Sequence, residues 1–79
     1  MKAIIYSDRN IECERAEALL DACNFDEVIT YHIDKDFTNN QFRDEFGFEA
    51  CYPQISIGIK HIGGLKETLH YLSDNGMFS

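Results

Sequence analysis

The chain has 79 residues, 44% of them hydrophobic, and its 14 acidic and 7 basic side chains give a formal charge of −7. This size suits one globular domain over residues 1–79. Its hydrophobic core is expected to be near the smallest that can keep a domain folded by itself. The acidic balance argues against nucleic acid as a partner, and the short apolar runs predict no membrane span. The first residues lack the pattern of a secretory signal, so we expect a cytoplasmic protein.

Strand and helix signals alternate along the first part of the chain. A β-rich run covers residues 2–6, and helical spacing of apolar side chains covers residues 11–23. Asn10 is placed to cap the start of this helix through its side-chain oxygen. The apolar stripe of the helix contains Cys13, Ala16, Leu20 and Cys23. This stripe predicts the helix face that packs against the sheet.

The second part of the chain continues the alternation. Its expected elements are a strand at residues 28–33, a short helix ending at Gly47, a hairpin of residues 55–57 and 60–62, and a helix at residues 65–72. The short helix opens with a capping box, Thr38-x-x-Gln41. The order β-α-β-α-β-β-α, with a parallel first strand pair, predicts an α/β domain.

The most informative stretch covers residues 52–64, which read YPQISIGIKHIGG. Pro53 is the only proline, and it opens a run in which apolar and small or polar residues alternate, as at the start of a strand. Gly63 and Gly64 permit a sharp turn, or the close approach of a ligand, just before the last helix. The strand-opening proline, the short hairpin, His-Ile-Gly-Gly and the final helix together resemble the C-terminal half of a glutaredoxin.

The N-terminal part carries the same resemblance. Residues 6–20 read YSDRNIECERAEALL, which is similar to the glutaredoxin stretch Tyr-Thr/Ser-Lys-Pro-x-Cys-Pro-Tyr-Cys-x-x-Ala-x-x-Leu-Leu. When Ala16 is matched, Cys13 takes the place of the family's second, resolving cysteine. The nucleophilic first cysteine then falls on Asn10, whose amide can cap a helix but cannot attack a disulfide.

The resemblance implies a thioredoxin-like (glutaredoxin) fold, with a four-stranded mixed sheet flanked by three helices. It also implies a cis peptide bond before Pro53. The activity it implies is thiol–disulfide exchange, a form of electron transport in which glutathione is the reductant. The family binds glutathione through a basic loop residue, the backbone at the cis-proline and the helix start after Gly-Gly. The position of the loop base is taken by Asp8 here, with Arg9 next to it as the base that would replace it, and the other positions are Tyr52, Pro53, Gly63 and Gly64. Asp8 and Lys66 depart from the family pattern and partly reverse the charges around this pocket.

Two interpretations of the cysteines at the site remain open. In the first interpretation, Cys13 lies on the apolar stripe as a buried thiol, and desolvation raises its pKa. In the second, the loop before Asn10, which is one residue shorter than in the glutaredoxin pattern, exposes Cys13 so that it acts as the nucleophile. Cys51 stands where the family usually has threonine, and it either forms a reversible pair with Cys13 or fills a small polar site. We expect Cys13 to be mostly buried and normal glutaredoxin turnover to be weak or absent.

Two functions follow from the resemblance. The first is a glutathione-linked thiol–disulfide oxidoreductase that acts through Cys13, with Asn10 in the nucleophile position weakening or abolishing the activity. The alternative is a redox-inactive binding module that recognises a peptide or partner protein through the cis-proline groove. An iron–sulfur carrier, as among monothiol relatives, fits less well because its coordinating cysteine falls on Asn10.

The remaining side chains predict no further cofactor. The three histidines and three cysteines lack the spacing of metal ligands, and no nucleotide-binding fingerprint is present. We expect a monomer whose partner is glutathione or a protein that bears a thiol or disulfide. Tyr6, Phe48 and Tyr52 are candidates for an aromatic rim around the site, although aromatic side chains in a small domain more often belong to its core.

Overall fold

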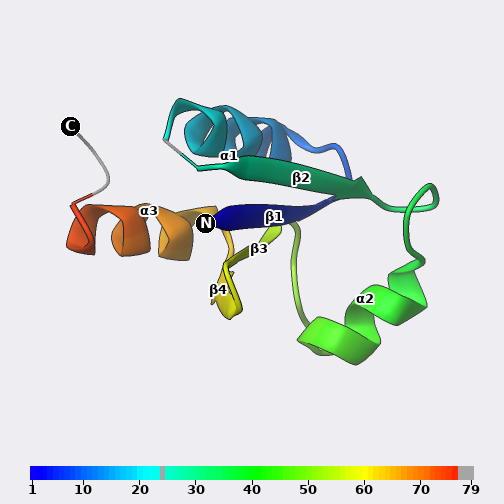
Figure 1. Ribbon diagram of the computed structural model, residues 1–79. Helices are drawn as coiled ribbons and strands as arrows, with labels where there is room; N and C mark the ends of the chain where they lie inside the picture. The colour runs from blue at the N-terminus through cyan, green and yellow to red at the C-terminus, as the bar shows by residue number, and fades with distance from the viewer. Residues whose placement is uncertain (24, 77–79) are drawn as a thin grey trace.

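The computed structural model describes residues 1–23 and 25–76 (Figure 1). Its elements are β1 (Lys2–Ser7), α1 (Ile11–Ala22), β2 (Glu27–His32), α2 (Asn39–Phe46), β3 (Gln54–Ile57), β4 (Lys60–Gly63) and α3 (Leu65–Asp74). The predicted order of strands and helices is confirmed, and only α3 ends more than one residue from its expected boundary. None of the helices within the described ranges has the length and apolar character needed to cross a bilayer.

The strands form one mixed sheet in the order β2-β1-β3-β4. The central strand β1 pairs in parallel with β2 and antiparallel with β3, and β4 pairs antiparallel with β3. The parallel pair is connected through α1, which gives the expected β-α-β start. This α/β topology, with its four-stranded mixed sheet and three helices, is thioredoxin-like.

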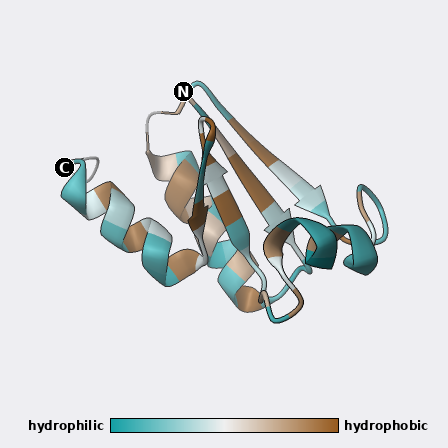
Figure 2. Ribbon diagram, turned by 90° about the horizontal axis from the view of Figure 1, so that it is seen from below, coloured by the Kyte–Doolittle hydropathy of each residue, from teal (hydrophilic) through white to brown (hydrophobic). Residues whose placement is uncertain are grey.

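The hydrophobic core lies between the sheet and the helices α1 and α3. Alternate strand residues point into it, since side chains along a strand alternate between the two faces of the sheet. The buried core residues are Ala3, Ile5, Ala16, Leu20, Cys23, Ile55, Ile57 and Leu72. Figure 2 shows the central strands largely brown and α2 largely teal, and Phe42 is the buried residue of α2.

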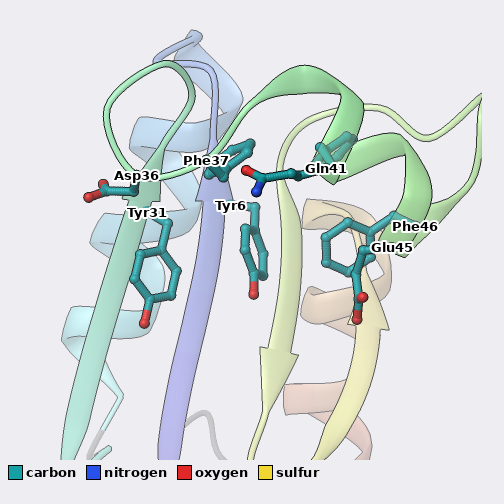
Figure 3. Close-up of a pocket in the computed structure, with 8 residues that line it drawn as sticks. Tyr6, Tyr31, Asp36, Phe37, Gln41, Glu45 and Phe46 are labelled. Carbon is teal, nitrogen blue, oxygen red and sulfur yellow. The ribbon is translucent and has the colours of Figure 1, made fainter.

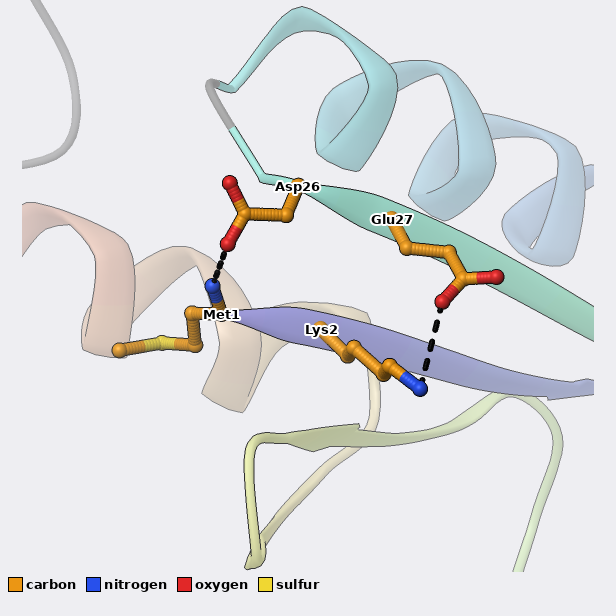
Figure 4. Close-up of polar contacts among 4 residues, drawn as sticks. All are labelled: Met1, Lys2, Asp26 and Glu27. Atoms are coloured by element: carbon orange, nitrogen blue, oxygen red, sulfur yellow. Dashed lines mark hydrogen bonds and ion pairs between the residues drawn. The ribbon is translucent and has the colours of Figure 1, made fainter.

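Polar contacts join the starts of β1 and β2 (Figure 4). The Met1 amino group forms an ion pair with Asp26, and the Asp26 backbone N–H donates to the Met1 carbonyl over 3.1 Å. The hydrogen bond from Met1 and its positive charge lower the pKa of the Asp26 carboxyl. Lys2 Nζ lies 3.4 Å from Glu27 Oε1. Because these pairs are exposed, they contribute little to the stability of the fold.

Helix α2 lies on the opposite face of the sheet and is short. Thr38 Oγ1 accepts the Gln41 backbone N–H over 3.1 Å, and Gln41 Oε1 accepts the Thr38 backbone N–H over 2.8 Å. The predicted capping box is therefore confirmed. Gly47 ends the helix with a φ of 106°, a conformation that favours glycine. The two turns of α2 lie near the ends of β1 and β2 (Figure 2).

Candidate functional site

The start of α1 is capped by an amide where the glutaredoxin resemblance places a nucleophilic thiol. Asn10 Oδ1 accepts the Cys13 backbone N–H over 2.8 Å, so the predicted N-cap is confirmed. An N-cap of this kind stabilises a helix by about 1 kcal/mol relative to alanine. The Asn10 side chain therefore supports the helix and supplies no group that can attack a disulfide.

Cys13 is buried, as its place on the apolar stripe of α1 predicted. It is only 2% exposed, and its Sγ–H donates to Asp8 Oδ1 over 3.5 Å. Burial raises the pKa of the Cys13 thiol, and the Asp8 carboxylate adds to the rise, while hydrogen bonds from Ser7 and the Asp8 backbone oppose it. A thiol with a raised pKa stays protonated at neutral pH, and a protonated thiol is a poor nucleophile.

The loop between β1 and α1 directs Asp8 toward this thiol. The Arg9 backbone N–H donates to Ser7 Oγ over 2.9 Å, and the Asn10 backbone N–H donates to Asp8 Oδ1 over 3.1 Å. Arg9 has a φ of 70°, so the backbone turns tightly at this residue. The same carboxylate oxygen of Asp8 thus accepts hydrogen bonds from Asn10 and Cys13. The loop presents an acid to Cys13, and Arg9 lies exposed beside it.

The cis-proline loop and the Gly-Gly turn lie side by side. The Tyr52–Pro53 peptide bond is cis, as the resemblance implied, and the Pro53 side chain is fully buried. A Cβ atom on Gly64 would lie 3.6 Å from the Pro53 carbonyl oxygen. The structure therefore brings Tyr52, Pro53 and Gly64 together, because the hairpin places the residues before β3 next to those after β4.

The start of α3 has a carboxylate close to it. Gly64 is the N-cap residue and makes no side-chain capping bond. A Cβ atom on Gly64 would lie 3.4 Å from Glu67 Oε2, and one on Gly63, whose φ is 125°, would lie 3.2 Å from Glu67 Cβ. The Glu67 carboxylate therefore complements the positive end of the α3 dipole and repels a second anion there.

The Gln54 side chain connects the cis-proline loop to β4. Its Nε2 donates to the Cys51 carbonyl over 2.7 Å, and its Oε1 lies 2.7 Å from His61 Nε2. The His61 ring also packs 5.0 Å from the ring of Phe46, measured between centroids. These contacts give His61 a structural place in the hairpin.

Tyr52 combines a fixed side chain with free backbone groups. Its ring stacks on Phe42 at a centroid distance of 4.0 Å, and its hydroxyl donates to Asn39 Oδ1 over 3.3 Å. Burial raises the pKa of the Tyr52 hydroxyl, with further contributions from the charges of Asp8 and Asp34. Within the part of the chain that the structure describes, the Tyr52 backbone N–H and C=O form no hydrogen bond to another backbone group.

The other expected features of the site are not assembled. All three cysteines are free thiols, and Cys51 is exposed, with its Sγ–H directed at the Glu49 carbonyl over 3.7 Å. A reversible pair of Cys13 and Cys51 stays a prediction. Phe48 is 79% exposed beneath the Arg43 guanidinium, whereas Tyr6 and Tyr52 lie in an aromatic cluster under α2. Phe48 therefore forms no rim with Tyr6 and Tyr52, whose rings belong to the packed aromatic cluster, which was the alternative interpretation of these side chains.

Alkylation should separate the exposed thiol of Cys51 from the buried thiol of Cys13. We expect iodoacetamide at neutral pH to modify Cys51 rapidly and Cys13 slowly, because burial and Asp8 keep the Cys13 thiol protonated. The alkylation rate of Cys13 should rise only toward more alkaline pH than that of a free thiol. Mass spectrometry of digests over a pH series measures both rates, with Cys51→Ser as the control. Rapid neutral labelling of Cys13 would contradict this description of the site.

Comparisons with known proteins give no family for this chain, since no family model matches it and no curated protein does. Among the described residues, no group of three or more His, Cys, Asp or Glu side chains is arranged to hold a metal ion. The chemistry available at the site is that of a buried protonated thiol, an exposed thiol and unpaired backbone beside a cis-proline.

Proposed function

We propose that this domain is a glutaredoxin-like binding module that recognises an extended peptide at its cis-proline loop. Its glutathione-linked oxidoreductase activity is weak or absent. The observation that carries this proposal is the environment of Cys13, which is 2% exposed and donates a hydrogen bond to Asp8. The position at the helix tip, where a thiolate would be exposed and stabilised, is filled by the amide of Asn10.

Recognition of a peptide rests on the Tyr52 backbone. An extended segment can pair with unpaired N–H and C=O groups beside a sheet, which gives affinity without a particular side chain. Gly64 lies next to Pro53 and has no side chain, so it leaves the approach to this backbone open. These features support a groove that binds a peptide mainly through main-chain hydrogen bonds and less through its side chains.

The charges around the groove favour a peptide over glutathione. Glutathione carries two carboxylates, while Asp8 lies at the α1 side of the groove and Glu67 at the start of α3. Arg9 is the base in the loop that offsets part of this repulsion. Glutathione therefore binds weakly in this proposal, and a neutral or basic peptide binds better.

A reductase assay tests the loss of activity. With glutathione as reductant, the mixed disulfide of glutathione and 2-mercaptoethanol should be reduced at the uncatalysed rate, and Cys13→Ser should leave that rate unchanged. A robust rate that disappears in the Cys13→Ser variant would overturn the proposal and establish an enzyme that works through this one cysteine.

A titration with S-methylglutathione tests recognition without thiol chemistry. We expect weak binding that shifts the NMR signals of the amides of Tyr52, Gln54 and Gly64. Asp8→Asn should tighten this binding severalfold, because it removes a negative charge next to the ligand. Asp21→Asn, which removes the same charge near the other end of α1, is the matched control and should have no effect. Shifts confined to residues outside the cis-proline loop would contradict the proposed groove.

A further inference from the structure

A pocket lies on the sheet face opposite Cys13 (Figure 3). Its floor is formed by Tyr6 and Tyr31, which are register partners in β1 and β2, and its wall is formed by α2 and the loop before it. The pocket has a volume of about 430 Å³. Its aromatic lining consists of Tyr6, Tyr31, Phe37, Phe42 and Phe46.

The rings in this pocket hold one another in place. The Tyr6 ring is at the centre, with centroid distances of 5.5 Å to Tyr31, 5.5 Å to Phe37 and 5.0 Å to Phe46. The interplanar angles of 35°, 76° and 61° mean that the rings meet tilted or edge to face. Such contacts are favourable for aromatic pairs, so the ring faces on the pocket side are fixed before any ligand arrives.

The polar atoms in the pocket are mostly hydrogen-bond acceptors, and they include the two carboxylates of Asp36 and Glu45. Figure 3 shows the hydroxyls of Tyr6 and Tyr31 and the carboxylate of Glu45 directed toward the same end of the pocket, with Gln41 above them. The Asp36 carboxylate already accepts the His32 backbone N–H over 2.9 Å. Glu45, in contrast, forms no ion pair with any other described residue.

Among the described residues, no lysine or arginine forms an ion pair with Asp36 or Glu45. The lining of the pocket contains no lysine or arginine in the part of the chain that the structure describes. Lys2 pairs with Glu27, and the Arg43 guanidinium lies over the ring of Phe48 at 4.8 Å. The pKa of the Tyr6 hydroxyl is raised by burial first and then by Tyr31 and Glu45, which agrees with negative potential at this point. The pocket therefore offers aromatic faces and negative charge together.

We propose that this pocket binds the guanidinium group of an arginine side chain from a partner peptide. A guanidinium is planar, stacks on aromatic faces and carries N–H donors that suit the carboxylate and hydroxyl oxygens of this pocket. A lysine ammonium has no plane to stack, and a quaternary ammonium has no N–H to donate. The formal charge of −7 also favours the approach of a basic partner.

This site is independent of the thiol chemistry. Side chains alternate along β1, so Ile5 and Ser7 point to one face of the sheet and Tyr6 points to the other. Cys13 packs on the face of Ile5 and Ser7. Binding of arginine at this pocket requires neither a reactive thiol nor the cis-proline groove. Its success or failure is therefore distinguishable from that of the proposed function.

The test uses N-acetyl-arginine methylamide as the probe, with the lysine and norleucine analogues beside it. NMR titration of the intact domain should shift the amides of Tyr6, Tyr31 and Glu45, and the arginine probe should bind most tightly. Glu45→Gln should weaken the binding of the arginine probe about fivefold, the upper range for a solvent-accessible ion pair. Asp44→Asn removes the same charge from the neighbouring position of α2, outside the pocket lining, and should leave the affinity unchanged.

Each other outcome overturns the proposal. Equal weakening by Glu45→Gln and Asp44→Asn would mean that net charge alone attracts the probe. Equal binding of the norleucine analogue would make the pocket a general apolar site, and equal binding of the lysine analogue would remove the case for a planar cation. Both variants change exposed side chains, so the fold is expected to survive them, and their amide spectra check this directly.

Discussion

Replacing Asn10 by cysteine is expected to raise glutathione-dependent reduction of the mixed disulfide by at least about tenfold over the natural chain. The new thiol stands at the N-terminus of α1, where Asn10 Oδ1 now accepts the Cys13 backbone N–H. A thiolate at this place accepts the same N–H and is stabilised by the helix dipole, which lowers its pKa. Cys13, three residues on, then takes the role of a resolving thiol.

The controls separate the thiol from the helix cap. Asn10→Ser keeps an oxygen that caps the helix and adds no sulfur, so its rate should match that of the natural chain. Combining Asn10→Cys with Cys13→Ser asks whether the second thiol is needed, since a single exposed thiolate can use glutathione itself to resolve the intermediate. If Asn10→Cys is no faster than Asn10→Ser, the site is not a glutaredoxin site that has lost its nucleophile.

Truncation of Leu20 should produce the largest loss of stability in this chain. Leu20→Ala is expected to lower the free energy of unfolding by about 3 kcal/mol, because it removes a fully buried side chain and leaves a cavity between α1 and the sheet. A domain of 79 residues has a total stability of roughly 4–12 kcal/mol, so this single change consumes a large part of it. Urea unfolding followed by circular dichroism measures the change.

Leu69 provides the matched control for this substitution. It is 41% exposed on α3, so Leu69→Ala removes the same atoms from a position with little packing. The expected loss is below about 1 kcal/mol. Similar losses for the two variants would mean that α1 does not pack on the sheet as described.

The elements of the fold could be predicted because their signals are local. Asn10 and the pair Thr38 and Gln41 mark helix starts through hydrogen bonds that span three residues, and the structure contains those bonds. The apolar stripe on α1 likewise predicted the burial of Cys13. Pro53 differs, because nothing in its neighbours specifies a cis bond, and that prediction came from the glutaredoxin resemblance.

The parts that the sequence did not reveal depend on distant segments. The pocket under α2 combines Tyr6, Tyr31 and Phe46 from three elements, and their proximity follows only from the β1–β2 register and the placement of α2. The spacing of Phe42 and Phe46, one helical turn apart, was a signal that these rings share a face. The direction of the Asp8 carboxylate also escaped prediction, since it depends on the backbone of a tight loop.

The central place of β1 in the sheet has a consequence for the synthesis of the chain on the ribosome. β1 can pair with β2 once the first 32 residues have emerged, but its other edge has no partner until Gln54–Ile57 follow. Chains grow at roughly 5–20 residues per second, so the open edge persists for roughly 1–5 seconds. An unpaired edge in a sheet is a template for aggregation. Nascent chains that have reached α2 and not yet β3 are therefore the species that we expect to depend most on chaperones.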